Sequence, residues 1–181
     1  MGWFDAICHM FATVATGGFS TRTESIAAYN SPAIEIVGII FMILGAISFP
    51  LILSTLNGRF HRARTNTELV AFLSILSVSV ITIAFVIIMD GTDKEPLHAI
   101  RSSAFQTVSI MTTTGFASED FAQWSALPQS LLLALMVIGG CSGSTAGGIK
   151  VNRVVVALRM CVLTIERSFR SRVVRQIRMN N

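Results

Sequence analysis

Residues 69–89 read LVAFLSILSVSVITIAFVIIM, a run of 21 residues without a charge or a proline. The hydrocarbon core of a bilayer is about 30 Å thick, and a helix of about 20 apolar residues crosses it. This run is therefore the clearest membrane-spanning helix that the sequence predicts. The preceding Thr65-Asn66-Thr67-Glu68 predicts a capping box at the start of that helix.

The composition places the chain in a membrane. It has 181 residues, of which 52% are hydrophobic and 13% are charged, and its mean hydropathy is +0.65. Soluble domains carry about 25% charged residues, so the charged share is about half of the usual one. A disordered chain, a disulfide scaffold and a collagen-like rod are excluded. The three cysteines, Cys8, Cys141 and Cys161, stand singly and are expected to be small buried side chains.

Two other segments are apolar enough to enter a membrane but too short to cross it. Residues 5–16 would form about 18 Å of helix, and residues 98–112 are a similar semi-polar segment. Each ends in a loop that contains glycine, Thr-Gly-Gly-Phe-Ser-Thr at 16–21 and Thr-Thr-Thr-Gly-Phe-Ala-Ser at 112–118. The sequence therefore predicts two re-entrant helices, each followed by a loop inside the membrane.

An apolar helix that opens at a proline follows each of these loops. Residues 32–56 are long enough to span, with a bend expected near Gly45 and Pro50. Residues 128–138 start a second such helix, which meets a glycine-rich stretch after 11 residues.

The two halves of the chain repeat at an offset of 97 residues. Thr16 aligns with Thr113, and Gly18-Phe19 aligns with Gly115-Phe116. A period near 100 residues is typical of membrane proteins built from repeated hairpins. We expect an all-α polytopic membrane protein made of helix, pore helix, filter loop and helix units, which are K⁺-channel-like pseudo-repeats.

These units divide the chain into three parts. Residues 1–64 would hold the pore helix, filter loop and inner helix of one repeat. Residues 65–160 would form the complete following repeat, with an outer helix, a pore helix, a filter loop and a glycine-broken inner helix. Residues 161–181 would form a basic cytosolic tail.

The charges predict how the chain is oriented. Three basic residues lie in residues 57–64 and eight in residues 150–181, whereas only Arg22, Lys94 and Arg101 lie elsewhere. The positive-inside rule then places the first two regions in the cytosol and both re-entrant helices at the outer face. The basic tail is expected to meet anionic membrane lipid or a cytosolic partner, and no nucleic acid.

The glycine loops predict a cation site. Non-helical backbone at membrane depth is tolerated where it lines water, and carbonyl oxygens there replace the hydration shell of an ion such as K⁺. The absence of a carboxylate ring argues against a Ca²⁺ or Mg²⁺ site. Ordinary glycine turns between helices are the alternative. The candidate K⁺-binding filter residues are Thr16, Gly17, Gly18, Thr113, Thr114 and Gly115.

Residues 139–148 read GGCSGSTAGG and are expected to break a helix near the middle of the membrane. The stretch lacks the Gly-Lys-Ser/Thr step of a nucleotide-binding P-loop. A loop that obstructs the ion path under the filter is favoured over a run of small residues for close helix packing. The candidate gating-loop residues are Gly139, Gly140, Gly143, Ser144, Thr145, Gly147, Gly148 and Lys150.

These three glycine-containing stretches together resemble the Trk/Ktr/HKT superfamily of K⁺ transporters, nearest to its bacterial TrkH branch. The resemblance implies four pseudo-repeats around one K⁺ pathway, with Gly18 and Gly115 as filter glycines of the second and third repeats. It implies an intramembrane gating loop at residues 139–150. The first and fourth repeats have no counterpart in the chain, which is therefore expected to be a fragment or a split part of the pore subunit.

The resemblance also implies partners and a location. The partners are the remaining repeats of the pore subunit, a second subunit in a homodimer, and cytosolic nucleotide-binding regulatory subunits. The location is the bacterial cytoplasmic (inner) membrane, crossed several times.

The function that we expect is K⁺ uptake across that membrane, with K⁺ as the transported ion and no cofactor. The alternative is a non-transporting truncated scaffold that only assembles with other subunits. An enzyme is not expected, because no nucleophile–base pair or metal-ligand spacing occurs.

Five further side chains lie near the predicted re-entrant helices or the membrane boundary. Glu35 is favoured as an interfacial capping acid over a cation relay, and His9 and His98 are given no role. Phe19 and Phe116 are expected to pack behind the filter loops.

Overall fold

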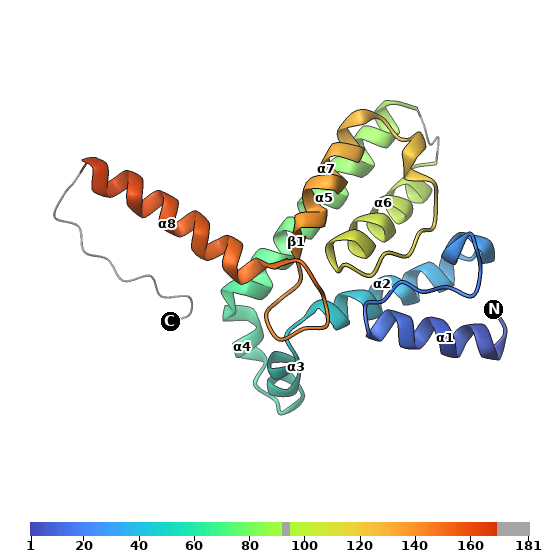
Figure 1. Cartoon of the computed structure of the whole chain (residues 1–181), viewed down its shortest axis with the longest axis horizontal. Coiled ribbons are helices and arrows are strands. Elements are labelled where there is room, and N and C mark those ends of the chain that lie inside the picture. Colours follow the sequence, from blue (N-terminus) through green and yellow to red (C-terminus); the bar gives the residue numbers. More distant parts are fainter. Residues whose placement is uncertain (92–94, 170–181) are drawn as a thin grey trace.

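The computed structural model describes residues 1–91 and 95–169 and is mostly helical (Figure 1). The helices are α1 (Trp3–Val14), η1 (Ser25–Tyr29), α2 (Pro32–Ala46), α3 (Phe49–Leu56), α4 (Phe60–Thr65), α5 (Thr67–Met89), α6 (Pro96–Met111), η2 (Phe121–Gln123), α7 (Ala126–Val137) and α8 (Val151–Phe169). Two short strands, β1 (Ile138–Gly139) and β2 (Ile149–Lys150), lie between α7 and α8.

Helix α5 is the one helix of the described residues that is by itself long and apolar enough to cross a membrane. The expected capping box at its start is wrong. Thr65 ends α4, and the side chain of Asn66 caps α5 by accepting a hydrogen bond from the Leu69 amide at 3.0 Å. The carboxylate of Glu68 instead accepts a hydrogen bond from the amide of Ser142, 74 residues away.

The apolar stretch 32–56 forms two helices that together are long and apolar enough to cross a membrane. Helices α2 and α3 meet at Ile47 and Ser48, where the chain turns by 102°. Pro50 lies in the first turn of α3, where its missing N–H costs no hydrogen bond. The bend expected near Gly45 and Pro50 is therefore confirmed, and it takes the form of a break between two helices.

Helix α6 lies at the centre of the fold. It packs against α5, α2 and α7, and nine of its 16 residues are buried. Helix α1 lies beside α2 (Figure 1). The main apolar core joins these helices and includes Met42, Phe72 and Phe105, none of which exposes any surface. The two short helices predicted from the sequence are thus present as α1 and α6.

The expected break of the last helix is confirmed. Helix α7 ends at Val137, and the chain leaves it through β1 and returns through β2, which pairs in parallel with β1 at Ile138↔Ile149 and Gly139↔Lys150. Helix α8 then points away from the other helices (Figure 1). The expected boundary of a tail at residue 161 lies inside α8, and residues 170–181 lie outside the described residues.

The cysteines differ from the expectation in part. Cys141 is buried and Cys8 is half-buried, but Cys161 is exposed on α8.

Candidate functional site

The two glycine loops share one backbone conformation. Thr16 and Thr113 have left-handed φ angles of 49° and 57°, and two residues later Gly18 and Gly115 have φ angles of 66° and 86°. A residue with a Cβ rarely adopts such angles. Both pairs are 97 residues apart, so the repeat seen in the sequence is also a repeat of the backbone.

In the two loops most amide N–H groups are hydrogen-bonded, whereas the carbonyl oxygens have no hydrogen-bond donor among the described residues. The amides of Thr16 and Gly17 donate to the end of α1, at 3.1 and 2.8 Å, and those of residues 113–115 donate to the end of α6, at 2.9–3.2 Å. Within the described residues, no hydrogen bond reaches a carbonyl oxygen of residues 16–18 or 113–115. Because backbone carbonyls are strong acceptors, this edge is suited to bind a cation.

The two loops lie against each other. A Cβ placed on Gly18 would be 2.0 Å from the carbonyl oxygen of Thr114, whereas a Cβ on Gly115 would meet no described atom within 4 Å. Beyond the loops, the amide of Ala27 donates to the carbonyl of Ala117 at 3.1 Å, and the amide of Ala117 donates to the hydroxyl of Ser25 at 3.2 Å. The candidate filter residues of the two halves of the chain are therefore in direct contact.

The expectation for the two phenylalanines holds for one of them. Phe116 is 3% exposed and packs behind its loop, but Phe19 is 81% exposed within this chain.

Polar groups at the start of α1 hold the segment that follows the first loop. The carboxylate of Asp5 accepts a hydrogen bond from the hydroxyl of Thr21 at 2.7 Å and lies 3.5 Å from the guanidinium of Arg22. The hydrogen bond from Thr21 contributes most to lowering the pKa of the Asp5 carboxyl, and the nearby Tyr29 hydroxyl and the charge of Arg22 lower it further. The ionised carboxylate therefore holds the segment that follows the first glycine loop.

The candidate gating loop is bonded to the end of α2. The amide and the hydroxyl of Thr145 both donate to the carbonyl of Gly45, at 3.2 and 3.0 Å, and the amide of Cys141 donates to the carbonyl of Ala46 at 2.9 Å. The last carbonyls of a helix have no partner inside it, so the loop supplies the donors that α2 lacks. Both the break after α2 and the loop after α7 are explained by this pairing.

The same loop reaches both candidate filter loops. The hydroxyl of Thr16 donates to the carbonyl of Thr145 at 2.9 Å, and the amide of Gly147 donates to the hydroxyl of Thr113 at 2.6 Å. The two residues with matching left-handed backbones are thus the two that bind the loop. The structure brings the predicted filter and gating-loop residues together.

Two of the loop glycines are required by close contact between backbones. A Cβ on Gly139 would lie 1.8 Å from the carbonyl oxygen of Gly147, and a Cβ on Gly140 would lie 2.8 Å from that of Ala46. Small residues are therefore needed for packing within the loop as well.

The remaining contacts of the candidate gating loop are made with the start of α3 and within the loop itself. The amide of Phe49 donates to the carbonyl of Gly143 at 3.0 Å, and the hydroxyl of Ser144 donates to the carbonyl of Cys141 at 2.6 Å. The ammonium of Lys150 donates to the carbonyl of Ala146. Gly148, with φ +68°, packs against Gly139.

The sequence did not indicate the distant partners of two charged side chains. Glu68 holds the gating loop through the amide of Ser142 at 2.5 Å. Glu35 lies in the first turn of α2, as expected, but it is buried within the chain and its carboxylate lies 2.9 Å from the guanidinium of Arg101 on α6. The positive charge at Arg101, close to the start of α6, was the only signal in the sequence for that pair.

No group of three or more His, Cys, Asp or Glu side chains that could hold a metal ion occurs among the described residues.

A family model described as TrkH, a cation transport protein, matches residues 1–181. The Trk system potassium uptake protein TrkH of Halomonas elongata is 39% identical over 159 residues, which are 88% of this chain and 33% of that protein. The protein of the same name from Escherichia coli K12 is 34% identical over 182 residues, which cover 100% of this chain and 38% of that protein.

A solved structure is similar over nearly the whole chain. The crystal structure of the potassium transporter TrkH from Vibrio parahaemolyticus matches with a TM-score of 0.92 and 34% identity, over 99% of this chain and 39% of that one. The chain thus spans between 33% and 39% of the length of these relatives.

Proposed function

The chain belongs to the TrkH family of cation transport proteins, and from this premise we propose that it forms part of a K⁺ uptake pathway across the bacterial cytoplasmic membrane. The named function of its relatives, potassium uptake, supports K⁺ as the ion. No enzyme activity is proposed, because these relatives are transporters.

One observation carries the proposal. The amides of residues 16, 17 and 113–115 donate to the preceding helix, while the carbonyl oxygens of residues 16–18 and 113–115 have no partner among the described residues. Free carbonyls inside a membrane protein are costly unless they face water or an ion. Oxygens arranged in this way replace the water around K⁺, so these six residues would form two sides of a selectivity filter.

The loop at residues 139–150 would act as a gate. Its hydrogen bonds to Thr16 and Thr113 would hold it under the filter, where it obstructs the ion path. Opening would require these bonds and those to Gly45 and Ala46 to break. Each bond has a modest net strength of about 1 kcal/mol, so a closed and an open arrangement can have similar free energies.

Two sides of a filter do not enclose an ion, so other chain segments would complete the pathway. We propose that they are the remaining repeats of the pore subunit, within a multi-pass homodimer of the inner membrane that binds cytosolic nucleotide-binding subunits. The alternative is a truncated scaffold that assembles without transporting K⁺.

Rubidium uptake by a completed subunit tests the proposal. In the completed subunit, residues 1–181 replace the matching 39% of TrkH from Vibrio parahaemolyticus. Cells that lack other K⁺ uptake systems should then take up ⁸⁶Rb⁺ and grow at low K⁺. Replacing both Gly18 and Gly115 with serine should lower the preference for Rb⁺ over Na⁺ while the protein still reaches the membrane.

The matched control is Gly58→Ser, because Gly58 also has a positive φ of 77° but lies between α3 and α4. An unchanged preference in the double glycine variant would refute the filter. A subunit that reaches the membrane but takes up no Rb⁺ would favour the scaffold.

A further inference from the structure

His9 is a buried polar side chain on α1 whose two ring nitrogens both have partners. The side chain is nearly inaccessible, with 5% of the residue exposed. Its Nδ1 lies 2.6 Å from the carbonyl oxygen of Asp5, and its Nε2 lies 2.9 Å from the hydroxyl oxygen of Ser20, just beyond the first filter loop. Residue 9 thus links the pore helix to the outer end of the filter.

The partners fix where the protons are. The carbonyl of Asp5 can only accept, so Nδ1 of His9 donates to it. In the neutral ring Nε2 then accepts, and the hydroxyl of Ser20 is its donor. The oxygen of Ser20 remains free to accept from the amide of Arg22, at 3.1 Å. A continuous path of hydrogen bonds therefore runs from α1 through His9 and Ser20 to the backbone at residue 22.

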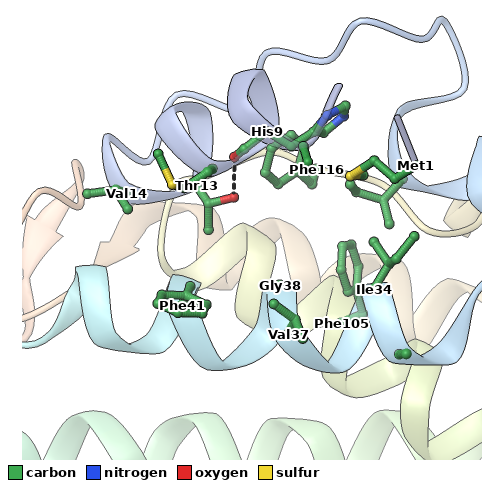
Figure 2. Close-up of a pocket in the computed structure, with 14 residues that line it drawn as sticks. Met1, His9, Thr13, Val14, Ile34, Val37, Gly38, Phe41, Phe105 and Phe116 are labelled. Atoms are coloured by element: carbon green, nitrogen blue, oxygen red, sulfur yellow. Dashed lines mark hydrogen bonds between the residues drawn. The ribbon is translucent and has the colours of Figure 1, made fainter. Parts of the chain in front are cut away.

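The imidazole also touches the other half of the chain. Its ring stacks on Phe116 of the second filter loop, with ring centroids 5.7 Å apart and planes at 30°. Tyr29 meets the ring edge-on, at 5.6 Å and 85°. Figure 2 shows His9 and Phe116 next to each other at an apolar cavity of about 460 Å³ between α1 and α2. The ring is therefore held by two hydrogen bonds and by its contacts with Phe116 and Tyr29.

The repeat contains a counterpart. Residue 106, which lies 97 positions after His9, is Gln106 on α6 and is 1% exposed. Its Nε2 donates to the carbonyl oxygen of Glu119 at 2.8 Å, and residue 119 lies 97 positions after Arg22. A buried side chain at the same place on both short helices is therefore connected to the backbone at the same place beyond both filter loops.

The first loop depends more on this connection than the second. On α6 the hydroxyl of Ser109 adds another bond, to the carbonyl of Phe116 at 2.6 Å. The matching residue on α1 is Ala12, which has no polar side chain. In the described structure, His9 is thus the one well-buried side chain of α1 that hydrogen-bonds to the segment after the filter, since Asp5 is only half-buried.

We propose that His9 is a positioning residue of the K⁺ filter, with Gln106 as its counterpart in the next repeat. Through Ser20 it sets the outer end of the loop at residues 16–20, and through Phe116 it couples that loop to the second one. This inference rests on the proposed function of the two loops as a filter.

The test compares three variants in the completed subunit. His9→Leu keeps much of the volume and removes both hydrogen bonds, and it should lower the Rb⁺ over Na⁺ uptake ratio by about tenfold at normal membrane abundance. His9→Gln introduces the residue that the other repeat uses, and its amide can reach Ser20, so the ratio should stay within about threefold of the unmodified protein. His61→Leu, on exposed α4, is the control for loss of a histidine and should not change the ratio.

Ser20→Ala supplies an independent arm, because it removes the partner hydroxyl and leaves the ring of His9 in place. Like His9→Leu, it should lower the Rb⁺ over Na⁺ uptake ratio. If His9→Leu does not fold, Ser20→Ala alone tests whether the bond between His9 and Ser20 positions the loop. Unchanged selectivity in His9→Leu or in Ser20→Ala overturns the inference, and so does an equal loss in His9→Gln and His9→Leu. The unmodified completed subunit separates this inference from the proposed function. If it is K⁺-selective, the proposed function stands even when the role of His9 is overturned. If it does not transport K⁺, the proposed function itself is overturned.

Discussion

Alanine at Gly18 and alanine at Gly115 should have unequal effects, although the sequence repeat makes the two positions equivalent. Both have positive φ, so alanine is strained at either one by about 1–2 kcal/mol, a factor of about 5–30 in the folded population. The surroundings differ. At Gly115 the new methyl group meets no described atom within 4 Å, whereas at Gly18 it would lie 2.0 Å from the carbonyl oxygen of Thr114.

In Gly18→Ala that oxygen has to retreat to at least 3.0 Å, so one substitution distorts both filter loops. We expect Gly115→Ala to lower the Rb⁺ over Na⁺ uptake ratio by up to about tenfold, and Gly18→Ala to lower it further, with a larger drop in thermal stability in detergent. Gly58→Ala is the control, because Gly58 also has a positive φ and open surroundings. This variant should lose thermal stability but keep the Rb⁺ over Na⁺ uptake ratio. Equal effects at Gly18 and Gly115, or reduced selectivity in Gly58→Ala, would refute this reasoning.

Three further predictions concern the loop, a buried ion pair and an outer carboxylate. Deleting several residues within 139–148 should raise K⁺ conduction, because the obstruction under the filter is removed; loss of Rb⁺ flux at normal membrane levels would count against a gate. Glu35→Gln leaves the guanidinium of Arg101 without its carboxylate partner, so the free energy of unfolding should fall by about 3 kcal/mol, while Glu35→Leu with Arg101→Met should regain part of it in thermal unfolding. The lowered pKa of the Asp5 carboxyl means that its hydrogen bond from Thr21 stabilises the fold above pH 3.8 and is lost as the pH falls below that value. Asp5→Asn should remove this acid dependence from unfolding curves, and an unchanged dependence would show that another group is responsible.

Local patterns explain why much of the architecture could be predicted from the sequence. The apolar run at 69–89, the proline at residue 32 and the glycines from residue 139 each act on their own neighbours, and they gave α5, the start of α2 and the end of α7. The alignment of Thr16-Gly-Gly with Thr113-Thr-Gly indicated two equivalent loops, and the structure gives both loops positive φ angles at their first and third residues.

Contacts between distant residues could not be predicted in the same way. The 102° turn after α2 is stabilised by donors from residues 141 and 145, and the carboxylate of Glu68 bonds to the amide of Ser142 instead of its own helix. His9 had no repeat partner of its own type, because the matching position holds glutamine. The chemical equivalence of the two side chains became visible only from their hydrogen bonds.

The most direct measurement of the central claim is the position of the ion. Crystals of the completed subunit grown in Rb⁺, or soaked with Tl⁺, should show anomalous density between the carbonyl oxygens of residues 16–18 and those of residues 113–115, and this density should weaken when both Gly18 and Gly115 are replaced with serine. Ordered ion density elsewhere in the pathway, with none between these two loops, would contradict the claim that they are the filter.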